Sequence, residues 1–179
     1  DTGTYDDANG IAYIQKYASI YGLNQKTGIE IEENTPEIAT EFPVMAAIGQ
    51  SDNNFTTVSL SRYVTAVASG KLYNYQLMSK IVDINGNVIE SYEPEYTDIS
   101  DTLNADQWDA IHSGMRMVVE NLDSFEGFEI PVAGKTGTAQ QIETRPNHAL
   151  FVGYFPYDNP KYSIAARIAY GYSSHNAAS

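Results

Sequence analysis

Apolar residues recur every three or four positions along three stretches of the chain, and this spacing predicts three amphipathic helices. The stretches are Ala8 to Tyr21, Thr56 to Ser69 and Asn104 to Leu122. Asp7 is positioned to cap the start of the first helix, and Gly22 and Gly70 stand where the first two helices would end. The third helix has the clearest start, because Asn104 and Gln107 have the spacing of a capping box.

Shorter apolar runs bounded by turn residues predict strands. They cover Tyr73 to Val82, Asn87 to Tyr92, Ile130 to Thr138, Ala149 to Phe155 and Tyr162 to Ala169. Asn85-Gly86 suits a two-residue type I′ turn between the first two strands, and residues 156–160 suit a turn between the last two. We expect Pro43 to Gln50 to form a short helix and Glu93 to Asp101 to form an acidic loop. The order of elements predicts an α+β fold, in which an antiparallel sheet packs against helices.

Composition narrows the classes of function. The chain has 179 residues, a length typical of one domain, and 42% of them are hydrophobic, which is enough for a core. Its net charge of -13 opposes binding to nucleic acid and to anionic lipid. The absence of cysteine excludes disulfides and thiolate zinc sites, and the three histidines lack the spacing of metal ligands. We therefore expect neither a metal nor another cofactor.

The most informative segment for chemistry is the run from Ala133 to Gln140. Lys135 stands among small and apolar residues, where a lysine can polarise hydroxyl groups or hold a substrate carboxylate. Thr136 and Thr138 add hydroxyl groups, and Gly137 lets a ligand approach the backbone closely. If this strand is exposed at a sheet edge, its N–H groups can bind an extended peptide or an oxyanion.

A phosphate-binding loop at Gly134-Lys135-Thr136 and a functional role for a second Lys-Thr-Gly triplet are both less well supported by the sequence. A phosphate-binding loop requires a glycine five positions before Gly134, and that position holds Glu129. A second triplet, Lys26-Thr27-Gly28, follows a helix cap, so we interpret it as a structural turn.

Several segments, in this order, resemble the end of the transpeptidase domain of penicillin-binding proteins, closest to the high-molecular-weight class B enzymes. These segments are 21–29, 47–50, 57–60, 108–119, 134–140, 151–156 and 159–160. The resemblance covers residues 10–172. It implies a partial serine transpeptidase/β-lactamase-like fold, with residues 1–179 as the C-terminal portion of the domain. Serine β-lactamases share the motif chemistry, but the long stretch between Gly22 and Lys135 favours a transpeptidase.

In this family a Ser-x-x-Lys motif supplies the nucleophile, and a Ser-x-Asn motif follows it. No serine stands three positions before any lysine of the chain. Ser51-Asp52-Asn53 matches Ser-x-Asn, but it directly follows Gly49-Gln50, which belongs to a different loop in the resemblance. We therefore expect the first two motifs and the final helix of the domain to lie outside this chain, which would be inactive alone.

The resemblance implies a D,D-transpeptidase that cross-links peptidoglycan stem peptides through an acyl-serine intermediate and binds β-lactams. Lys135 would position the substrate carboxylate, Thr136 and Thr138 would bind it, and the Thr138 N–H would form half of the oxyanion hole. Gly137 would permit close approach. Further substrate contacts are expected at Gly134, Gln140 and His148.

The implied partners are stem peptides, β-lactams, the remainder of the domain, and the machinery of cell division or elongation. The implied location is the extracytoplasmic face of a bacterial membrane, with an anchor outside this chain. A different class of function remains open, namely a non-catalytic binding or scaffolding module with the same fold.

Overall fold

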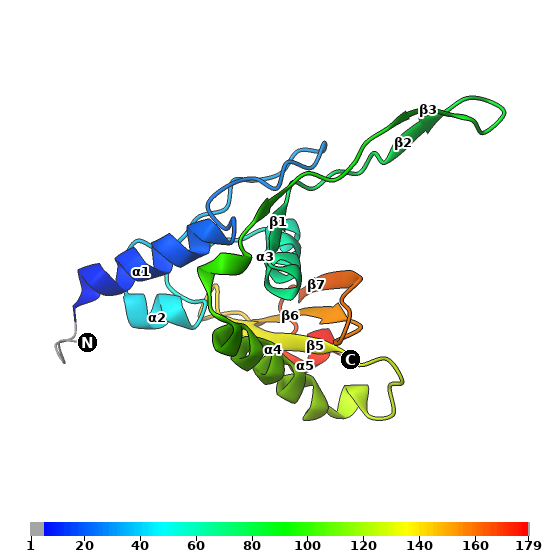
Figure 1. Ribbon diagram of the computed structural model, residues 1–179. Coiled ribbons are helices and arrows are strands. Elements are labelled where there is room, and N and C mark those ends of the chain that lie inside the picture. Colours follow the sequence, from blue (N-terminus) through cyan, green and yellow to red (C-terminus); the bar gives the residue numbers. More distant parts are fainter. Residues whose placement is uncertain (1–5, 179) are drawn as a thin grey trace.

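The computed structural model describes residues 6–178 (Figure 1). Its helices are α1 (Asp7–Ile20), α2 (Pro43–Ala47), α3 (Thr57–Ser69), α4 (Ala105–Glu120) and α5 (His175–Ala178), with 3-10 turns η1 (Ser100–Thr102) and η2 (Asp123–Phe125). Its strands are β1 (Lys71–Tyr73), β2 (Lys80–Val82), β3 (Val88–Ser91), β4 (Tyr96–Asp98), β5 (Ala133–Ala139), β6 (His148–Phe155) and β7 (Tyr162–Ile168). The α+β class is confirmed.

Capping residues account for where the long helices begin. Asp6, rather than Asp7, is the N-cap of α1, and its carboxylate accepts the N–H groups of Ala8 and Asn9. Thr56 caps α3 through the N–H of Ser59. The capping box of α4 forms as its sequence predicts.

The central sheet is antiparallel and has the order β5-β6-β7, so β5 and β7 are its two edges. Lys135 pairs with Val152, and Val152 pairs with Ala165. Because directly paired residues share a face of the sheet, this register fixes which side chains lie together.

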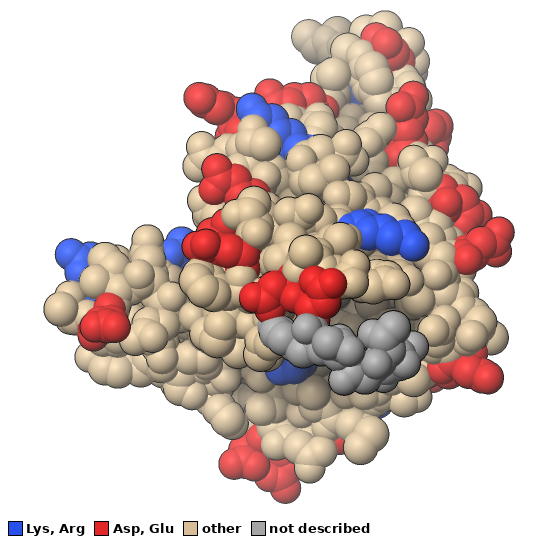
Figure 2. All heavy atoms as spheres, turned by 90° about the vertical axis from the view of Figure 1, so that its left-hand side faces the viewer, with Lys and Arg blue, Asp and Glu red and all other residues tan. Residues whose placement is uncertain are grey.

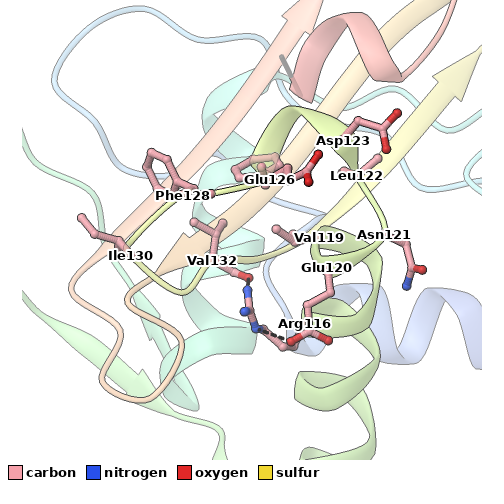
Figure 3. Close-up of a pocket in the computed structure, with 12 residues that line it drawn as sticks. Arg116, Val119, Glu120, Asn121, Leu122, Asp123, Glu126, Phe128, Ile130 and Val132 are labelled. Atoms are coloured by element: carbon pink, nitrogen blue, oxygen red, sulfur yellow. Dashed lines mark hydrogen bonds and ion pairs between the residues drawn. The ribbon is translucent and has the colours of Figure 1, made fainter.

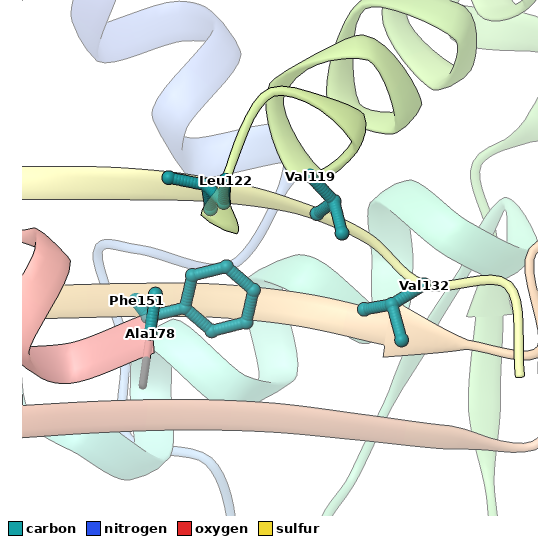
Figure 4. Packing of buried hydrophobic residues seen from close by; sticks show 5 residues of the cluster. All are labelled: Val119, Leu122, Val132, Phe151 and Ala178. Carbon is teal, nitrogen blue, oxygen red and sulfur yellow. The ribbon is translucent and has the colours of Figure 1, made fainter. Parts of the chain in front are cut away.

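Helices cover both faces of this sheet (Figure 1). On one face, Val64 of α3 packs with Ala133 and Tyr154. On the other face, α4, its following turn and α5 close a cluster of apolar side chains (Figure 4). That cluster consists of Val119, Leu122, Val132, Phe151 and Ala178. Burying such a set on each face is what fixes the sheet between its helices.

A two-stranded hairpin, β2–β3, projects away from the body (Figure 1). Its base is held by Glu30, whose carboxylate accepts the N–H groups of Leu77 at 2.6 Å and Met78 at 3.2 Å. At its tip the Ile84 side chain is 100% exposed.

Three sequence expectations about this region are wrong. Tyr73 to Val82 is not one strand, because β1 pairs with β4 and β2 pairs with β3. The Asn85-Gly86 turn is not type I′, since only Gly86 of the two has a positive φ, of 86°. The segment Glu93 to Asp101 is not only a loop, because it contains β4 and the start of η1.

Candidate active site

The candidate strand β5 starts in the core and emerges at its lysine. Val132, Ala133 and Gly134 are buried, whereas Lys135 is exposed. A Cβ atom on Gly134 would clash with the Phe151 ring and would lie 2.8 Å from the Val152 carbonyl oxygen. Gly134 is thus required by packing beneath the strand, and it is not among the residues that line the hollow described next.

Beyond Gly134, the strand forms one wall of a hollow of about 360 Å³. Residues Lys135 to Ala139 supply this wall, and the opposite walls come from α1, the α2 region and α3. The apolar part of the lining includes Ile14, Ala18, Leu60, Tyr63, Leu150 and Val152. The hollow therefore combines an open strand edge that carries polar groups with a floor of apolar side chains.

Within this wall the side chains of Lys135 and the two threonines are accessible. The Lys135 ammonium donates to the backbone oxygen of Thr136 at 2.8 Å, and among residues 6–178 no carboxylate lies within ion-pairing distance of it. Thr138 Oγ1 accepts the N–H of Ser174 at 3.3 Å. The ammonium is thus available to an anionic group of a ligand.

Gly137 differs from Gly134 in its surroundings. A Cβ atom at this position would lie 3.4 Å from the Leu150 Cβ, which is an ordinary contact. The fold itself therefore does not demand a glycine here, and the space above the strand is left for a ligand.

His148 is buried, with 5% of its surface exposed, at the start of β6. Its Nδ1 accepts the N–H of Tyr170 at 3.0 Å, so Nε2 carries the hydrogen and donates to Gln141 Oε1 at 2.8 Å. Arg167 Nη2 lies 3.0 Å from the same Nε2. Burial, together with the Arg167 cation, lowers the pKa of His148.

Both ring nitrogens of His148 are therefore engaged within the protein. These bonds connect the starts and ends of neighbouring strands, and His148 also lines a hollow of about 510 Å³ beside the Lys135 hollow. Gln140 is exposed and lines this same hollow, together with Gln50 and Arg167.

Sequence analysis did not identify Arg167 as a residue that lies near this motif. Gly137 pairs with Leu150, and Leu150 pairs with Arg167, so the three residues lie in one row across the sheet. This register brings a cation into the lining of the neighbouring hollow of about 510 Å³, from a residue 30 positions further along the chain than Gly137.

The other Lys-Thr-Gly triplet, residues 26–28, and the Ser-x-Asn match, residues 51–53, have structural roles, as expected. In the first triplet, Thr27 is fully buried and its N–H and hydroxyl bond to the Glu33 carboxylate. In the second segment, Asp52 bonds to Thr40, and Asn53 accepts the N–H of Ala39 at 2.9 Å. Neither segment borders the Lys135 wall except through Asn53, whose side chain is occupied within its own loop.

Another hollow, of about 630 Å³, lies at the end of α4 (Figure 3). Arg116 crosses it, pairs with Glu120 at 3.1 Å and donates to the Val132 carbonyl oxygen. None of the residues predicted for chemistry lines it. It is formed by the loop that returns from α4 to β5, on the side of the sheet opposite α3.

Acidic side chains are spread over the face that Figure 2 shows, in keeping with the net charge of -13. Among residues 6–178, no group of histidine, aspartate and glutamate side chains is arranged to hold a metal ion. None of the helices described is long and apolar enough to cross a bilayer.

Comparison with known proteins places the chain in a family. The chain is 30% identical over 210 residues to peptidoglycan D,D-transpeptidase MrdA of Haemophilus influenzae, which covers 94% of this chain and 31% of that protein. It is 27% identical over 185 residues to penicillin-binding protein H of Bacillus subtilis, covering 89% of this chain and 25% of that protein. The chain thus spans between a quarter and a third of the length of these curated relatives.

The fold is also similar to that of penicillin-binding proteins. The structure of penicillin-binding protein A from M. tuberculosis, as an imipenem acyl-enzyme complex, superimposes with a TM-score of 0.77 at 19% identity, over 90% of this chain and 38% of that one. This likeness confirms the serine transpeptidase/β-lactamase-like fold. A family model described as the penicillin-binding protein transpeptidase domain matches residues 5–179. The chain therefore belongs to the penicillin-binding protein transpeptidase family.

Proposed function

We propose that residues 1–179 form the C-terminal portion of a peptidoglycan D,D-transpeptidase domain and supply the Lys-Thr-Gly side of its active site. The observation that carries this proposal is the open edge of β5, where Lys135 to Ala139 border a hollow. An open edge lets an extended peptide add to the sheet through backbone hydrogen bonds. A D-alanyl peptide end is an extended peptide with a terminal carboxylate. This suits the ammonium of Lys135, which is exposed and donates to the Thr136 backbone oxygen but pairs with no carboxylate among residues 6–178.

In the proposed reaction, a serine from another part of the domain attacks the carbonyl carbon between two D-alanines. The bond to the terminal D-alanine breaks, this residue leaves as a free amino acid, and an acyl-serine ester remains. An amine of a neighbouring stem peptide then attacks the ester, forms the cross-link and releases the serine hydroxyl. β-Lactams would acylate the same serine.

In that reaction the residues of β5 bind and orient the donor peptide. The Lys135 ammonium and the hydroxyl groups of Thr136 and Thr138 bind the terminal carboxylate. The Thr138 N–H and the serine's own N–H stabilise the oxyanion, a contribution for which loss of one donor typically costs about 10²–10³ in rate. Gln140 binds the peptide further along the strand edge.

The remainder of the domain is the first partner of this chain. The apolar lining of the hollow, which includes Ile14, Ala18 and Tyr63, suits a helix that carries the Ser-x-x-Lys motif and packs its apolar side against this floor. The other proposed partners are stem peptides, β-lactams and the division or elongation machinery. The proposed location is the extracytoplasmic face of the membrane, with the anchor outside this chain.

The proposal is tested by titrating the ¹⁵N-labelled chain with a peptide that ends in D-alanyl-D-alanine. We expect saturable shifts of the amide signals from Lys135 to Gln140, and a marked loss of binding in Lys135→Ala. Lys26→Ala is the matched control, because it alters the other Lys-Thr-Gly triplet, and it should bind normally. Shifts that are absent, or that survive Lys135→Ala unchanged, refute the proposed peptide groove.

Labelling with a fluorescent penicillin tests whether the chain alone contains a reactive serine, and so distinguishes an enzyme fragment from a complete enzyme. We expect no covalent labelling of the chain alone, because no Ser-x-x-Lys motif is present. Covalent labelling would show that a nucleophile exists within residues 1–179. Normal peptide binding by a parent protein that lacks such a motif altogether would favour a non-catalytic binding module.

A further inference from the structure

Arg167 is a cation beside the proposed peptide groove. It lies on β7 and lines the hollow of about 510 Å³ that adjoins the Lys135 hollow. The two hollows are continuous, because Gln50 and Ala139, among other residues, line both of them. Arg167 stands in one row with Gly137, which is two residues along β5 from Lys135, so these residues lie on the same face of the sheet. A ligand that occupies the Lys135 hollow can therefore extend to Arg167.

The acidic residues of the chain do not neutralise Arg167. No aspartate or glutamate lines the hollow of about 510 Å³, although the chain has 23 acidic residues. On its other side Arg167 borders a hollow of about 570 Å³, where Glu37 is the acidic residue of the lining. Even so, among residues 6–178 no carboxylate lies within ion-pairing distance of the Arg167 guanidinium. The positive charge is thus available to a ligand.

The position of the guanidinium is set by a contact that supplies no acceptor. Arg167 Nη2 lies 3.0 Å from His148 Nε2, which carries a hydrogen because Nδ1 accepts the Tyr170 N–H. Two donors therefore face each other at this contact. Because His148 belongs to β6 and pairs with Ala139 of β5, the arginine side chain leans across the sheet toward the open edge. A ligand that brings an acceptor to this point would use donors that the fold leaves free.

Neutral amide groups surround this cation. The side chains of Gln50, Asn54 and Gln140 line the hollow and make no hydrogen bond within residues 6–178. Their N–H groups can donate to an anionic ligand beside Arg167, whereas a cationic ligand would be repelled by the arginine. The hollow therefore favours an anion, and the planar fork of a guanidinium suits the two oxygens of a carboxylate.

We infer that Arg167 binds a side-chain carboxylate on the residue that precedes the two D-alanines of the donor peptide. This inference rests on the proposed peptide groove, in which the terminal carboxylate lies at Lys135 and the chain runs along the edge past Ala139 and Gln140. From a strand added beside β5 to a guanidinium that lies over β6 is two strand spacings, or about 10 Å. The acidic side chain must therefore be long, like that of 2-aminoadipate. Arg167 thus selects donor peptides by the charge of this side chain.

The experiment compares two acetylated tripeptides that end in D-alanyl-D-alanine and begin with either 2-aminoadipate or its side-chain amide. Each is titrated into the full ¹⁵N-labelled chain. Both should give saturable shifts of the amide signals from Lys135 to Gln140, and the acidic peptide should bind about tenfold more tightly. The Nε–H signal of Arg167 should move with the acidic peptide only, because the amide cannot pair with the guanidinium.

Substitution of the arginine tests the assignment. Arg167→Gln should lower the affinity for the acidic peptide to that for the amide peptide, and should leave binding of the amide peptide unchanged. Lys80→Gln is the matched control, because it removes the same charge from an exposed position on the projecting hairpin. This control should retain the tenfold preference.

The outcomes separate this inference from the proposed function. Equal affinities of the unaltered chain for the two peptides overturn the role of Arg167 and leave the peptide groove standing, and this comparison needs no variant. A preference that survives in Arg167→Gln, or that is lost equally in Lys80→Gln, also overturns that role. If neither peptide binds, the groove itself is refuted and this inference falls with it.

Discussion

Arg62 donates a hydrogen bond from Nη1 to the backbone carbonyl oxygen of Lys26 at 3.0 Å, and so ties the first Lys-Thr-Gly triplet to the interior. The same guanidinium donates to the carbonyl oxygens of Gly22 and Gln25. The second triplet has no such tie, and its lysine faces a hollow. The two Lys-Thr-Gly triplets have the same sequence, but only the first is bonded to the interior of the fold by a buried side chain.

Replacing Arg62 by methionine should destabilise the chain by about 3 kcal/mol, because the Gly22 carbonyl oxygen, in a buried bond, and the partly buried bonds to Gln25 and Lys26 lose their donor. The Arg62 side chain is only 1% exposed, so water cannot readily take its place. Urea denaturation followed by circular dichroism measures the change. Lys26→Ala, which leaves the carbonyl oxygen in place, should change the free energy of unfolding by less than about 0.5 kcal/mol. Equal effects of the two substitutions would contradict this role of Arg62.

Gly134 and Gly137 should respond differently to substitution by alanine. Gly134→Ala places a methyl group against Phe151 and the backbone of β6, and we expect a loss of about 1–3 kcal/mol from overpacking. Gly137→Ala meets only Leu150 at 3.4 Å, so stability should change by less than about 1 kcal/mol.

Gly137→Ala should instead weaken binding of the D-alanyl-D-alanine peptide, since the methyl group occupies the space above the strand. Thermal unfolding and peptide titration of both variants give the two readouts. A stable Gly137→Ala variant that binds peptide normally would argue against close approach at this position.

Stability should fall as the pH decreases through the range in which His148 titrates in the unfolded chain. The folded pKa of His148 is lowered by burial and by Arg167, so between the two pKa values the unfolded state takes up a proton that the folded state does not. Stability is therefore lost on acidification from about pH 7 towards pH 5 and levels off below the folded pKa.

His148→Asn removes this titration while keeping an acceptor oxygen near the N–H of Tyr170. Urea denaturation at a series of pH values should show a shallower dependence for the variant than for the unaltered chain. His112 and His175 are present in both proteins and cancel in the comparison. Parallel curves would mean that His148 has the same pKa in both states.

Removing the N-cap of α4 by Asn104→Ala should cost about 1 kcal/mol, because the N–H of Gln107 loses its acceptor at 2.9 Å. Gln107→Ala removes only the reciprocal bond to the Asn104 N–H, at 3.0 Å, and should cost less. Chemical denaturation of both variants tests this order. A larger loss in Gln107→Ala would show that packing, rather than capping, sets the start of the helix.

Local signals explain why the helices could be predicted from the sequence. The cap at Thr56, the capping box at Asn104 and the C-cap glycine at Gly70 each act within a few residues, so their effects are visible in a short window. The three strands of the central sheet were also predicted, since turn residues separate apolar runs of suitable length.

Pairings between distant residues could not be predicted in the same way. β1 finds its partner in the acidic segment at Tyr96–Asp98, which carries no strong strand signal of its own. The approach of Arg167 to the motif depends on the register of two strand pairs, and the occupation of both His148 nitrogens depends on Gln141 and Tyr170. Such contacts are set by tertiary structure, which a window of sequence does not contain.

The projecting hairpin β2–β3 is attached to the body at its base, where Glu30 accepts two backbone N–H groups. Because both strands leave the body and return to it near this carboxylate, a small tilt at the base sweeps Ile84 through a much wider arc. Burial of that tip against a neighbouring molecule would therefore be felt as torque on the segment that leads from the hairpin into β1.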